Sequence, residues 1–249
     1  MSNGANLHTR ATMFALAKAV IVEAPDGGQF RTFVAHAHNK PVGRIVSRKS
    51  RLAFNWEGFG ERHMAMISDA HDRVERYVLQ PHRLDVMLGD RPEPVSYFPD
   101  MKREMADGAI EIIEIKKTSK EISADPDYAR KIAKARSVYA AKGWTFRIVT
   151  EEDDINRDPL LPNAQMIYAD AFTKIGSRER LALVETFDAV ESVAYAKAIE
   201  IIAKVGGYDE LRAKCVLHAL VSTRWAGLDL TSKITADTAV FRPETRGRR

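Results

Sequence analysis

The chain of 249 residues lacks the features that mark several large classes of protein. Its single cysteine, Cys215, excludes an intramolecular disulfide, and nothing indicates an oxidising compartment. No apolar run approaches the roughly 20 residues of a membrane-spanning helix, and no secretory leader stands out. Because no Walker-type glycine-rich loop is present, we expect no ATP hydrolysis by this chain. We expect a cytoplasmic protein with no membrane partner.

The overall composition is that of an ordinary globular protein. Hydrophobic residues make up 45% of the chain and charged residues 29%, which excludes a disordered or low-complexity chain. The 38 Lys and Arg residues exceed the 34 Asp and Glu residues, giving a net charge of +4. This mildly basic balance is compatible with nucleic-acid binding but does not by itself indicate it.

The first two thirds of the chain have the pattern of an α/β domain. Apolar spacing predicts a helix over residues 60–70. Asp107-Gly108 is a strong hairpin signal, and Asp125-Pro126 begins a second predicted helix that ends at Lys142-Gly143. The predicted strands are residues 75–79, 83–88, 101–105, 109–116 and 145–149.

The last third is predicted to be mainly helical. Residues 156–163 contain two prolines and no periodicity, so they are expected to be a linker. Cys215 is expected to pack in the core of a helix pair. The predicted helices are residues 168–174, 177–187, 190–205 and 209–222. A short hairpin over 228–230 and 239–241 completes the element order of a winged helix. We therefore divide the chain into an extension (1–40), two domains (41–160 and 165–243) and a basic tail (244–249).

Three side chains around the predicted hairpin form a candidate catalytic group. Strand side chains alternate, so Glu114 and Lys116 project to the same face, and the turn folds their strand back past Asp100. Two carboxylates packed together need a neutralising cation, and their oxygen ligands suit Mg²⁺ or Mn²⁺ rather than zinc. Glu61, on the predicted upstream helix, is a candidate third carboxylate.

Phosphodiester hydrolysis is the chemistry that this group supports. A carboxylate-bound metal lowers the pKa of a water and stabilises charge on phosphate, and Lys116 would orient that water or balance the phosphate charge. Taken alone, Glu114-Ile-Lys116 is a common triplet and is more typical of the solvated face of an amphipathic strand. His36 and His38 have no matching Cys or His cluster, so we expect their spacing to be incidental.

The order of these motifs resembles the PD-(D/E)xK nuclease superfamily. A helix Glu is followed by Pro99-Asp100 and then by Glu114-Ile-Lys116. Within that superfamily the chain is similar to the TnsA endonuclease subunit of heteromeric cut-and-paste transposases. The segments that carry this similarity are residues 46–49, 56–61, 77–81, 97–100, 114–116, 142–151 and, more loosely, 230–240.

The resemblance implies a restriction-endonuclease-like N-terminal domain, a mixed sheet flanked by helices, and a winged-helix-like C-terminal domain. It implies Glu61, Asp100, Glu114 and Lys116 as catalytic residues. It also implies metal ligation by the first three and by the Ile115 carbonyl, with Mg²⁺ as the metal and Mn²⁺ as a substitute. Glu57 remains an alternative to Glu61, and Gln80 would support the site without being catalytic.

The implied activity is Mg²⁺-dependent cleavage of one DNA strand at each transposon end. The implied partners are double-stranded DNA, an integrase-type transposase subunit and an ATP-dependent regulator. Arg130, Lys131, Lys134 and Lys142 are candidate phosphate contacts, although such a run also fits a solvated helix face. Two other functions remain open: a free-standing nuclease of the same superfamily for phage DNA processing, repair or restriction, and a non-catalytic DNA-binding assembly protein.

Overall fold

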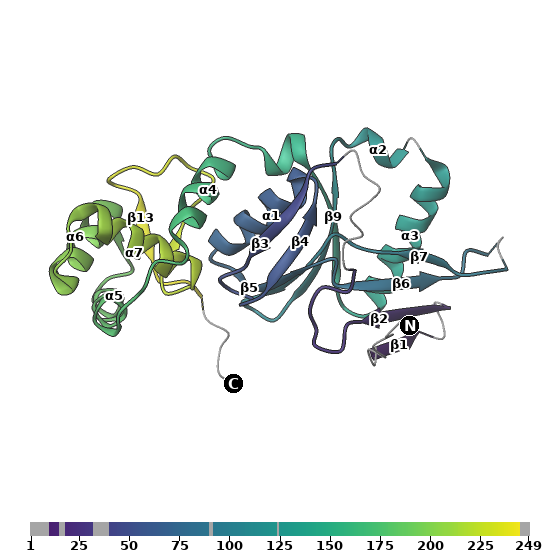
Figure 1. The fold of residues 1–249 in the computed structure, drawn as a ribbon, viewed down its shortest axis with the longest axis horizontal. Helices are drawn as coiled ribbons and strands as arrows, with labels where there is room; N and C mark the ends of the chain where they lie inside the picture. Colours follow the sequence, from purple (N-terminus) through teal and green to yellow (C-terminus); the bar gives the residue numbers. More distant parts are fainter. Residues whose placement is uncertain (1–9, 15–17, 32–39, 90–91, 124, 245–249) are drawn as a thin grey trace, which may run out of the picture.

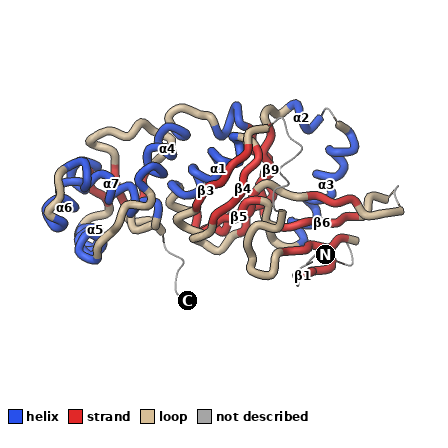
Figure 2. Tube along the Cα trace, in the orientation of Figure 1, coloured by secondary structure: helices blue, strands red, loops and turns tan. Residues whose placement is uncertain are grey.

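The computed structural model describes residues 10–14, 18–31, 40–89, 92–123 and 125–244. Figure 1 shows an elongated molecule with strands in its centre and at one end, and with α5, α6 and α7 gathered at the other end. The same division is visible in Figure 2, where helices dominate the C-terminal end. His36 and His38 lie outside the described residues.

A mixed four-stranded sheet forms the centre of the N-terminal part, in the order β10-β9-β8-β5. β8 pairs antiparallel with both β5 and β9, whereas β9 and β10 are parallel. The predicted turn is confirmed, with Gly108 at a φ of 88° and the Asp107 side chain accepting a hydrogen bond from Ala109 N–H at 2.9 Å. The strands are β5 (Val74–Leu79), β8 (Met101–Met105), β9 (Ile110–Lys116) and β10 (Thr145–Thr150).

Helices cover both faces of this sheet because its central strand is apolar on both sides. Ile113 packs in the cluster that contains the buried face of α1 (Phe59–Ala70). Its neighbour Ile112 points the other way, into the cluster that contains α3 (Pro126–Ala141). The predicted start of α3 is confirmed, since the Asp125 side chain caps the helix and Pro126 follows it.

Further strands extend the N-terminal part. A second four-stranded sheet has the order β1-β2-β6-β7, and β3 pairs with β4 in a hairpin. β2 pairs antiparallel with β6, so part of the segment expected to be an extension contributes strands to this sheet. The strands are β1 (Arg10–Phe14), β2 (Ala19–Glu23), β3 (Val42–Val46), β4 (Ala53–Glu57), β6 (His82–Val86) and β7 (Val95–Tyr97).

The C-terminal part is mainly helical, and it corrects several predictions. The predicted helix 168–174 ends at Asp170, and the predicted helix 190–205 begins only at Tyr195 because residues 192–194 form a strand. The expected linker is wrong from residue 160 onward, because α4 begins there and ends at Asp170. The buried Asn163 ties this helix to a distant loop, since its side-chain amide donates to the Leu230 and Ser232 carbonyls at 3.0 and 2.8 Å. Cys215 is only half-buried. The helices are α4 (Leu160–Asp170), α5 (Ser177–Ala189), α6 (Tyr195–Gly206) and α7 (Glu210–Ser222).

The predicted terminal hairpin is part of a three-stranded sheet. Its order is β11-β13-β12, so β13 pairs with a strand from before α6 as well as with β12. The expected stop after α6 is confirmed by Gly207, which has a φ of 66°. The strands are β11 (Ser192–Ala194), β12 (Gly227–Leu228) and β13 (Ala239–Phe241). A short helix, α2 (Lys120–Ser123), and a π-helical turn, Glu151–Ile155, complete the described elements.

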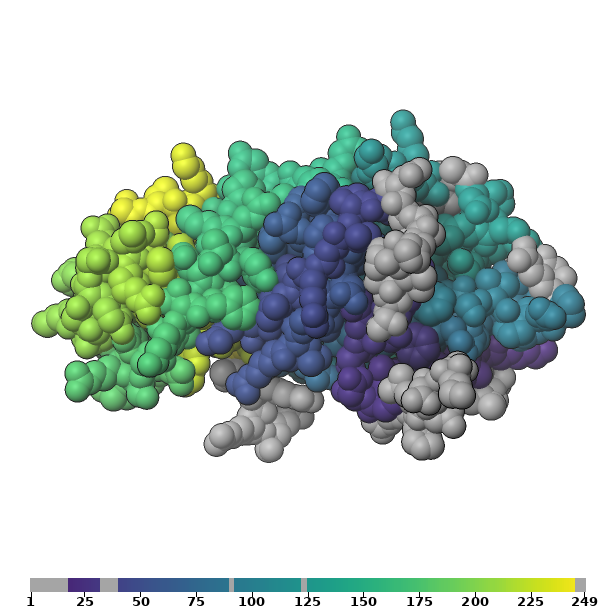
Figure 3. Space-filling view, viewed as in Figure 1, coloured from purple at the N-terminus to yellow at the C-terminus, as the bar shows by residue number. Residues whose placement is uncertain are grey.

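One apolar core runs through both parts of the chain. α4 packs against α1 on one side and against α7 on the other. The cluster that contains Ile113 therefore continues through Ile167 of α4 to Leu217 of α7. Figure 3 shows the green C-terminal residues packed directly against the blue residues of the N-terminal part. In the described part of the chain, no helix is both long and apolar enough to cross a bilayer.

Candidate active site

Four strands meet at one edge of the mixed sheet. Because β9 and β10 are parallel and β8 is antiparallel to β9, the start of β8 lies beside the ends of β9 and β10. The end of β5 lies there too, through the pairing of Leu79 with Met101. This topology brings Gln80, Asp100 and Lys116 to the same edge. α1 contributes its first turn, including Glu61, from the adjoining face.

A pocket of about 430 Å³ opens at this edge. It contains three of the four predicted catalytic residues, together with charged neighbours from several loops. Gly60 allows α1 to come close, since a Cβ there would lie 2.8 Å from both Ile115 Cγ2 and Glu151 Oε1. The acidic residues that line the pocket are Glu57, Glu61, Asp100, Glu121 and Glu151, and the basic ones are Lys40, Lys116 and Lys117.

Asp100 is held at the floor of the pocket by backbone contacts. Its Oδ2 accepts a hydrogen bond from Ile115 N–H at 2.6 Å, and its carbonyl accepts one from Gln80 N–H at 2.8 Å. Burial raises the pKa of Asp100 well above its usual range, and the charges of Glu114 and Glu61 raise it further. A cation at this position would relieve that concentration of negative charge.

Glu114 is buried, and protein donors surround its carboxylate. Tyr97 Oη donates to Oε2 at 2.5 Å, and Tyr128 Oη donates to Oε1. Lys116 Nζ lies 2.7 Å from the same Oε1. The expected proximity of Glu114 and Lys116 on one face of β9 is confirmed, and both contact Tyr128 of α3. Lys116 also lines the pocket, whereas Glu114 is not among its lining residues.

Glu61 is the helix carboxylate that the structure places in the pocket. Its Oε2 accepts a hydrogen bond from Glu57 N–H at 3.0 Å, and its Oε1 accepts one from the Gln80 side chain at 3.2 Å. Burial raises the pKa of Glu61 to about 7, against the lowering effect of these two hydrogen bonds. Glu57 lines the same pocket but is less buried, so Glu61 is the stronger candidate of the two.

The three predicted carboxylates do not form a closed metal cage. Among the residues that the structure describes, no three His, Cys, Asp or Glu side chains are grouped closely enough to hold an ion. The physical reason is that Tyr97, Tyr128 and Lys116 hold the Glu114 carboxylate, while Glu57 and Gln80 hold that of Glu61.

The donor set nevertheless fits Mg²⁺. This ion is usually bound through one or two carboxylates, with water and substrate phosphate completing its coordination. Asp100 is the best-placed ligand, because it lines the pocket and feels the charges of two neighbouring carboxylates. The Ile115 amide is engaged by Asp100, and ligation by the Ile115 carbonyl remains a prediction.

The four candidate DNA-contacting residues lie on α3 or just after it. Arg130 Nη2 lies 2.6 Å from Asp127 Oδ1, and Lys142 Nζ lies 4.0 Å from the centre of the Trp144 ring. Lys131 Nζ lies 5.1 Å from the centre of the Tyr128 ring. Lys134 is half-buried on the same helix. Of the four, Lys131 is the residue whose charge lies over the ring of Tyr128, the residue that contacts Glu114.

Sequence reasoning missed three side chains at this site. Tyr97 and Tyr128 donate to Glu114, and Glu151 reaches the pocket from the end of β10. Tyr97 could have been identified from its place in the sequence, because it lies only three residues before Asp100 in the Tyr97-Phe-Pro-Asp100 segment. Tyr128 has no comparable local signal, because its contact with Glu114 depends on how α3 packs against the sheet.

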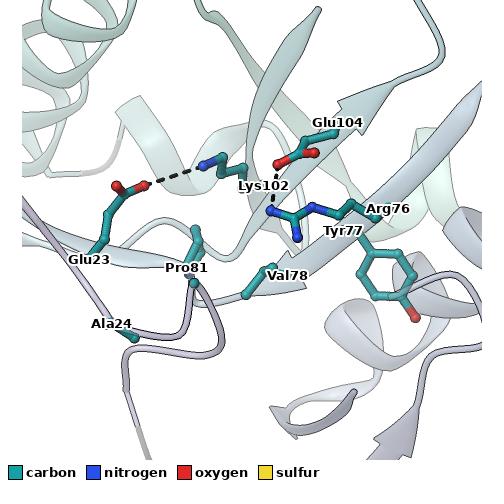
Figure 4. Close-up of a pocket in the computed structure, with 9 residues that line it drawn as sticks. Glu23, Ala24, Arg76, Tyr77, Val78, Pro81, Lys102 and Glu104 are labelled. Carbon is teal, nitrogen blue, oxygen red and sulfur yellow. Dashed lines mark hydrogen bonds and ion pairs between the residues drawn. The ribbon is translucent and has the colours of Figure 1, made fainter. Parts of the chain in front are cut away.

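A smaller pocket of about 160 Å³ lies between strands β5 and β8 of the mixed sheet and the end of β2, which belongs to the second sheet. Figure 4 shows that its charged side chains face one another. Lys102 lies 3.3 Å from Glu23, and Arg76 lies 2.8 Å from Glu104. Since these charges are already neutralised by each other, the pocket with Asp100 is the better candidate for an ionic substrate.

Comparison with known proteins adds no assignment to this geometry. No protein-family model matches the chain. No curated protein matches it significantly. The candidate site therefore stands on the chemistry and arrangement of its own residues.

Proposed function

We propose that this protein is a Mg²⁺-dependent DNA endonuclease, acting as the nuclease subunit of a heteromeric cut-and-paste transposase. The observation that carries the proposal is the position of Asp100. It lies against the Ile115 amide of the Glu114-Ile-Lys116 strand and lines one pocket with Glu61 and Lys116. This arrangement combines oxygen ligands for a metal with a lysine beside them.

The order of elements supports the restriction-endonuclease-like fold within this proposal. A helix, three antiparallel strands, a second helix and a parallel fourth strand make up the central sheet and its two covering layers. The helices and three-stranded sheet of the C-terminal part support a winged-helix-like domain, which would bind DNA or the transposase partner. The integrase-type partner and the ATP-dependent regulator follow from the resemblance of the sequence motifs to TnsA.

The residues of the chain have separate roles in this mechanism. Asp100, Glu114 and Glu61 would hold Mg²⁺, which supplies Lewis-acid chemistry to the phosphodiester. Lys116 would orient the attacking water or neutralise the phosphate. Lys131 and Lys134 would contact the DNA backbone without reading its sequence. Strand choice and site recognition would then come largely from the partner.

Plasmid nicking in the presence of Mg²⁺ or Mn²⁺ tests this proposal. We expect Asp100→Asn and Lys116→Ala to abolish nicking, while Glu200→Gln, an exposed α6 residue, leaves it unchanged. Each protein is assayed alone and with an integrase-type transposase encoded beside it. Dependence on that transposase supports the subunit assignment, and nicking without it favours a free-standing nuclease. Equal nicking by all variants, or none in any setting, would refute the catalytic assignment.

A further inference from the structure

Tyr128 contacts both members of the Glu-x-Lys pair. It lies in the first turn of α3, where its amide donates to the capping Asp125 carboxylate at 3.2 Å. Its hydroxyl donates to Glu114 Oε1, and Lys116 Nζ lies 4.4 Å from the centre of its ring. A single half-buried side chain thus touches a predicted metal ligand and the predicted catalytic lysine.

We infer that Tyr128 is a positioning residue that fixes the relative placement of Glu114 and Lys116. This inference rests on the proposed nuclease function. Tyr128 acts through its two neighbours, whereas Asp100, Glu114 and Lys116 would meet the metal or the substrate directly. Tyr97 is a second positioning residue for Glu114, because its hydroxyl donates to the other carboxylate oxygen, Oε2.

The number of donors limits what Glu114 can do. An ionised carboxylate has about four acceptor positions. Tyr97, Tyr128 and Lys116 direct three donors at Glu114, which leaves about one position for a metal. Without the Tyr128 hydroxyl, Lys116 is the remaining donor to Oε1, so the Glu114 carboxylate can tilt about its Tyr97 contact and Lys116 can move with it. Polar groups behind a metal ligand typically alter metal affinity or activity by about 10- to 100-fold when they are removed.

Tyr128 also connects the Glu114–Lys116 pair to the rest of α3. A tyrosine hydroxyl, with an ordinary pKa of about 10, is protonated at neutral pH and can donate to Glu114. The ring also faces Lys131, whose Nζ lies 5.1 Å from its centre. Because Lys131 is a candidate phosphate contact, Tyr128 would link the DNA-facing helix to the Glu114–Lys116 pair.

Mn²⁺ binding to the full-length protein without DNA is the first readout, measured by electron paramagnetic resonance of free Mn²⁺. We expect Tyr128→Phe to weaken Mn²⁺ binding by about 10-fold or more. Tyr208→Phe is the matched control, because it removes a hydroxyl that donates to Glu179 at 2.6 Å, outside the pocket. Tyr97→Phe is a second variant that removes the other donor to Glu114 and should act in the same direction.

The nicking assay gives a second readout, with kcat calculated per folded molecule, because loss of folded protein also lowers the apparent kcat without changing KM. We expect Tyr128→Phe to lower kcat while leaving KM for DNA unchanged, because the substitution retains the ring and Lys131. Wild-type-like Mn²⁺ affinity and kcat in both Tyr128→Phe and Tyr97→Phe would overturn the inference, provided that Asp100→Asn loses Mn²⁺ binding. If wild type binds no Mn²⁺ at this pocket, both this inference and the proposed function fail.

Discussion

The Ile115 amide donates to Asp100 across 2.6 Å, joining the start of β8 to the end of β9. Gln80 N–H holds the Asp100 carbonyl from the other side, at the end of β5. The position of the Asp100 carboxylate is therefore set by backbone contacts of three strands. Such a carboxylate does not need a bound ion to find its place, which is the property expected of a preorganised site.

The close approach of α1 to the sheet predicts a strong effect of Gly60→Ala. The new Cβ would lie 2.8 Å from Ile115 Cγ2 and from Glu151 Oε1, so either these side chains or the first turn of α1, which carries Glu61, must shift. Both changes alter the pocket. We expect nicking to fall by about 10- to 100-fold, since small misplacements of reacting groups have effects of this size. Gly89→Ala is the control, because its Cβ would meet no atom within 4 Å. Wild-type nicking by Gly60→Ala would show that this packing does not position the site.

The raised pKa of Glu61 predicts a pH-dependent stability effect in the absence of metal. Between about pH 4.5 and 7 the folded protein retains a proton that the unfolded chain releases, so its free energy of unfolding falls as pH rises. Glu61→Gln lacks this titration, so its free energy of unfolding should not show this fall. Between pH 5 and pH 8, we expect the stability of the variant relative to wild type to rise by up to about 3 kcal/mol. Urea denaturation in EDTA at both pH values measures the difference. An equal difference at the two values would contradict the assignment of a raised pKa.

The position of Lys134 on α3 predicts a change in the salt dependence of DNA binding. A lysine that contacts one phosphate contributes about 0.9 to the slope of log affinity against log salt concentration. We expect Lys134→Ala to reduce that slope by about this amount and to weaken binding equally for unrelated sequences. Lys204→Ala, on α6 at the opposite end of the molecule (Figure 1), is the comparison. An unchanged slope would contradict the phosphate contact and show that Lys134 is only a solvated residue of its helix.

The buried Asp69 predicts a large stability loss on substitution. Its carboxylate accepts hydrogen bonds from the Ser47 hydroxyl at 3.0 Å, the Lys49 amide at 3.1 Å and the Tyr77 hydroxyl at 2.9 Å. Asp69→Ala leaves these donors without their acceptor, and we expect the free energy of unfolding to fall by about 3 kcal/mol or more. Asp237→Ala, at an exposed position, should change it by less than about 0.5 kcal/mol. Similar urea midpoints for both variants would contradict this prediction.

Local signals explain the parts of the fold that were predictable from sequence. The hairpin followed from Asp107-Gly108, and the start of α3 followed from Asp125-Pro126. Each signal lies within a few residues of the structure that it specifies. The same holds for the candidate site, since one turn and the alternation of β9 bring Asp100, Glu114 and Lys116 together.

Contacts between distant residues explain the parts that could not be predicted. α4 begins at Leu160 where a linker was expected, and its buried Asn163 is held by carbonyls nearly seventy residues away. β11 is a strand because it pairs with β13, which is about 47 residues further along the chain. Tyr128 reaches Glu114 only after α3 has packed on the sheet. Apolar periodicity and turn motifs are local patterns, so they do not indicate which distant residues will come into contact.

The shared core of α1, α4 and α7 makes the two parts of the chain a single cooperative unit. A fragment ending before α4 would keep every residue of the candidate site, yet the side of α1 that α4 covers would face water. Calorimetry of the intact protein should accordingly give one heat-absorption peak rather than two. The helical part therefore covers one side of α1 and completes the apolar core of the N-terminal part.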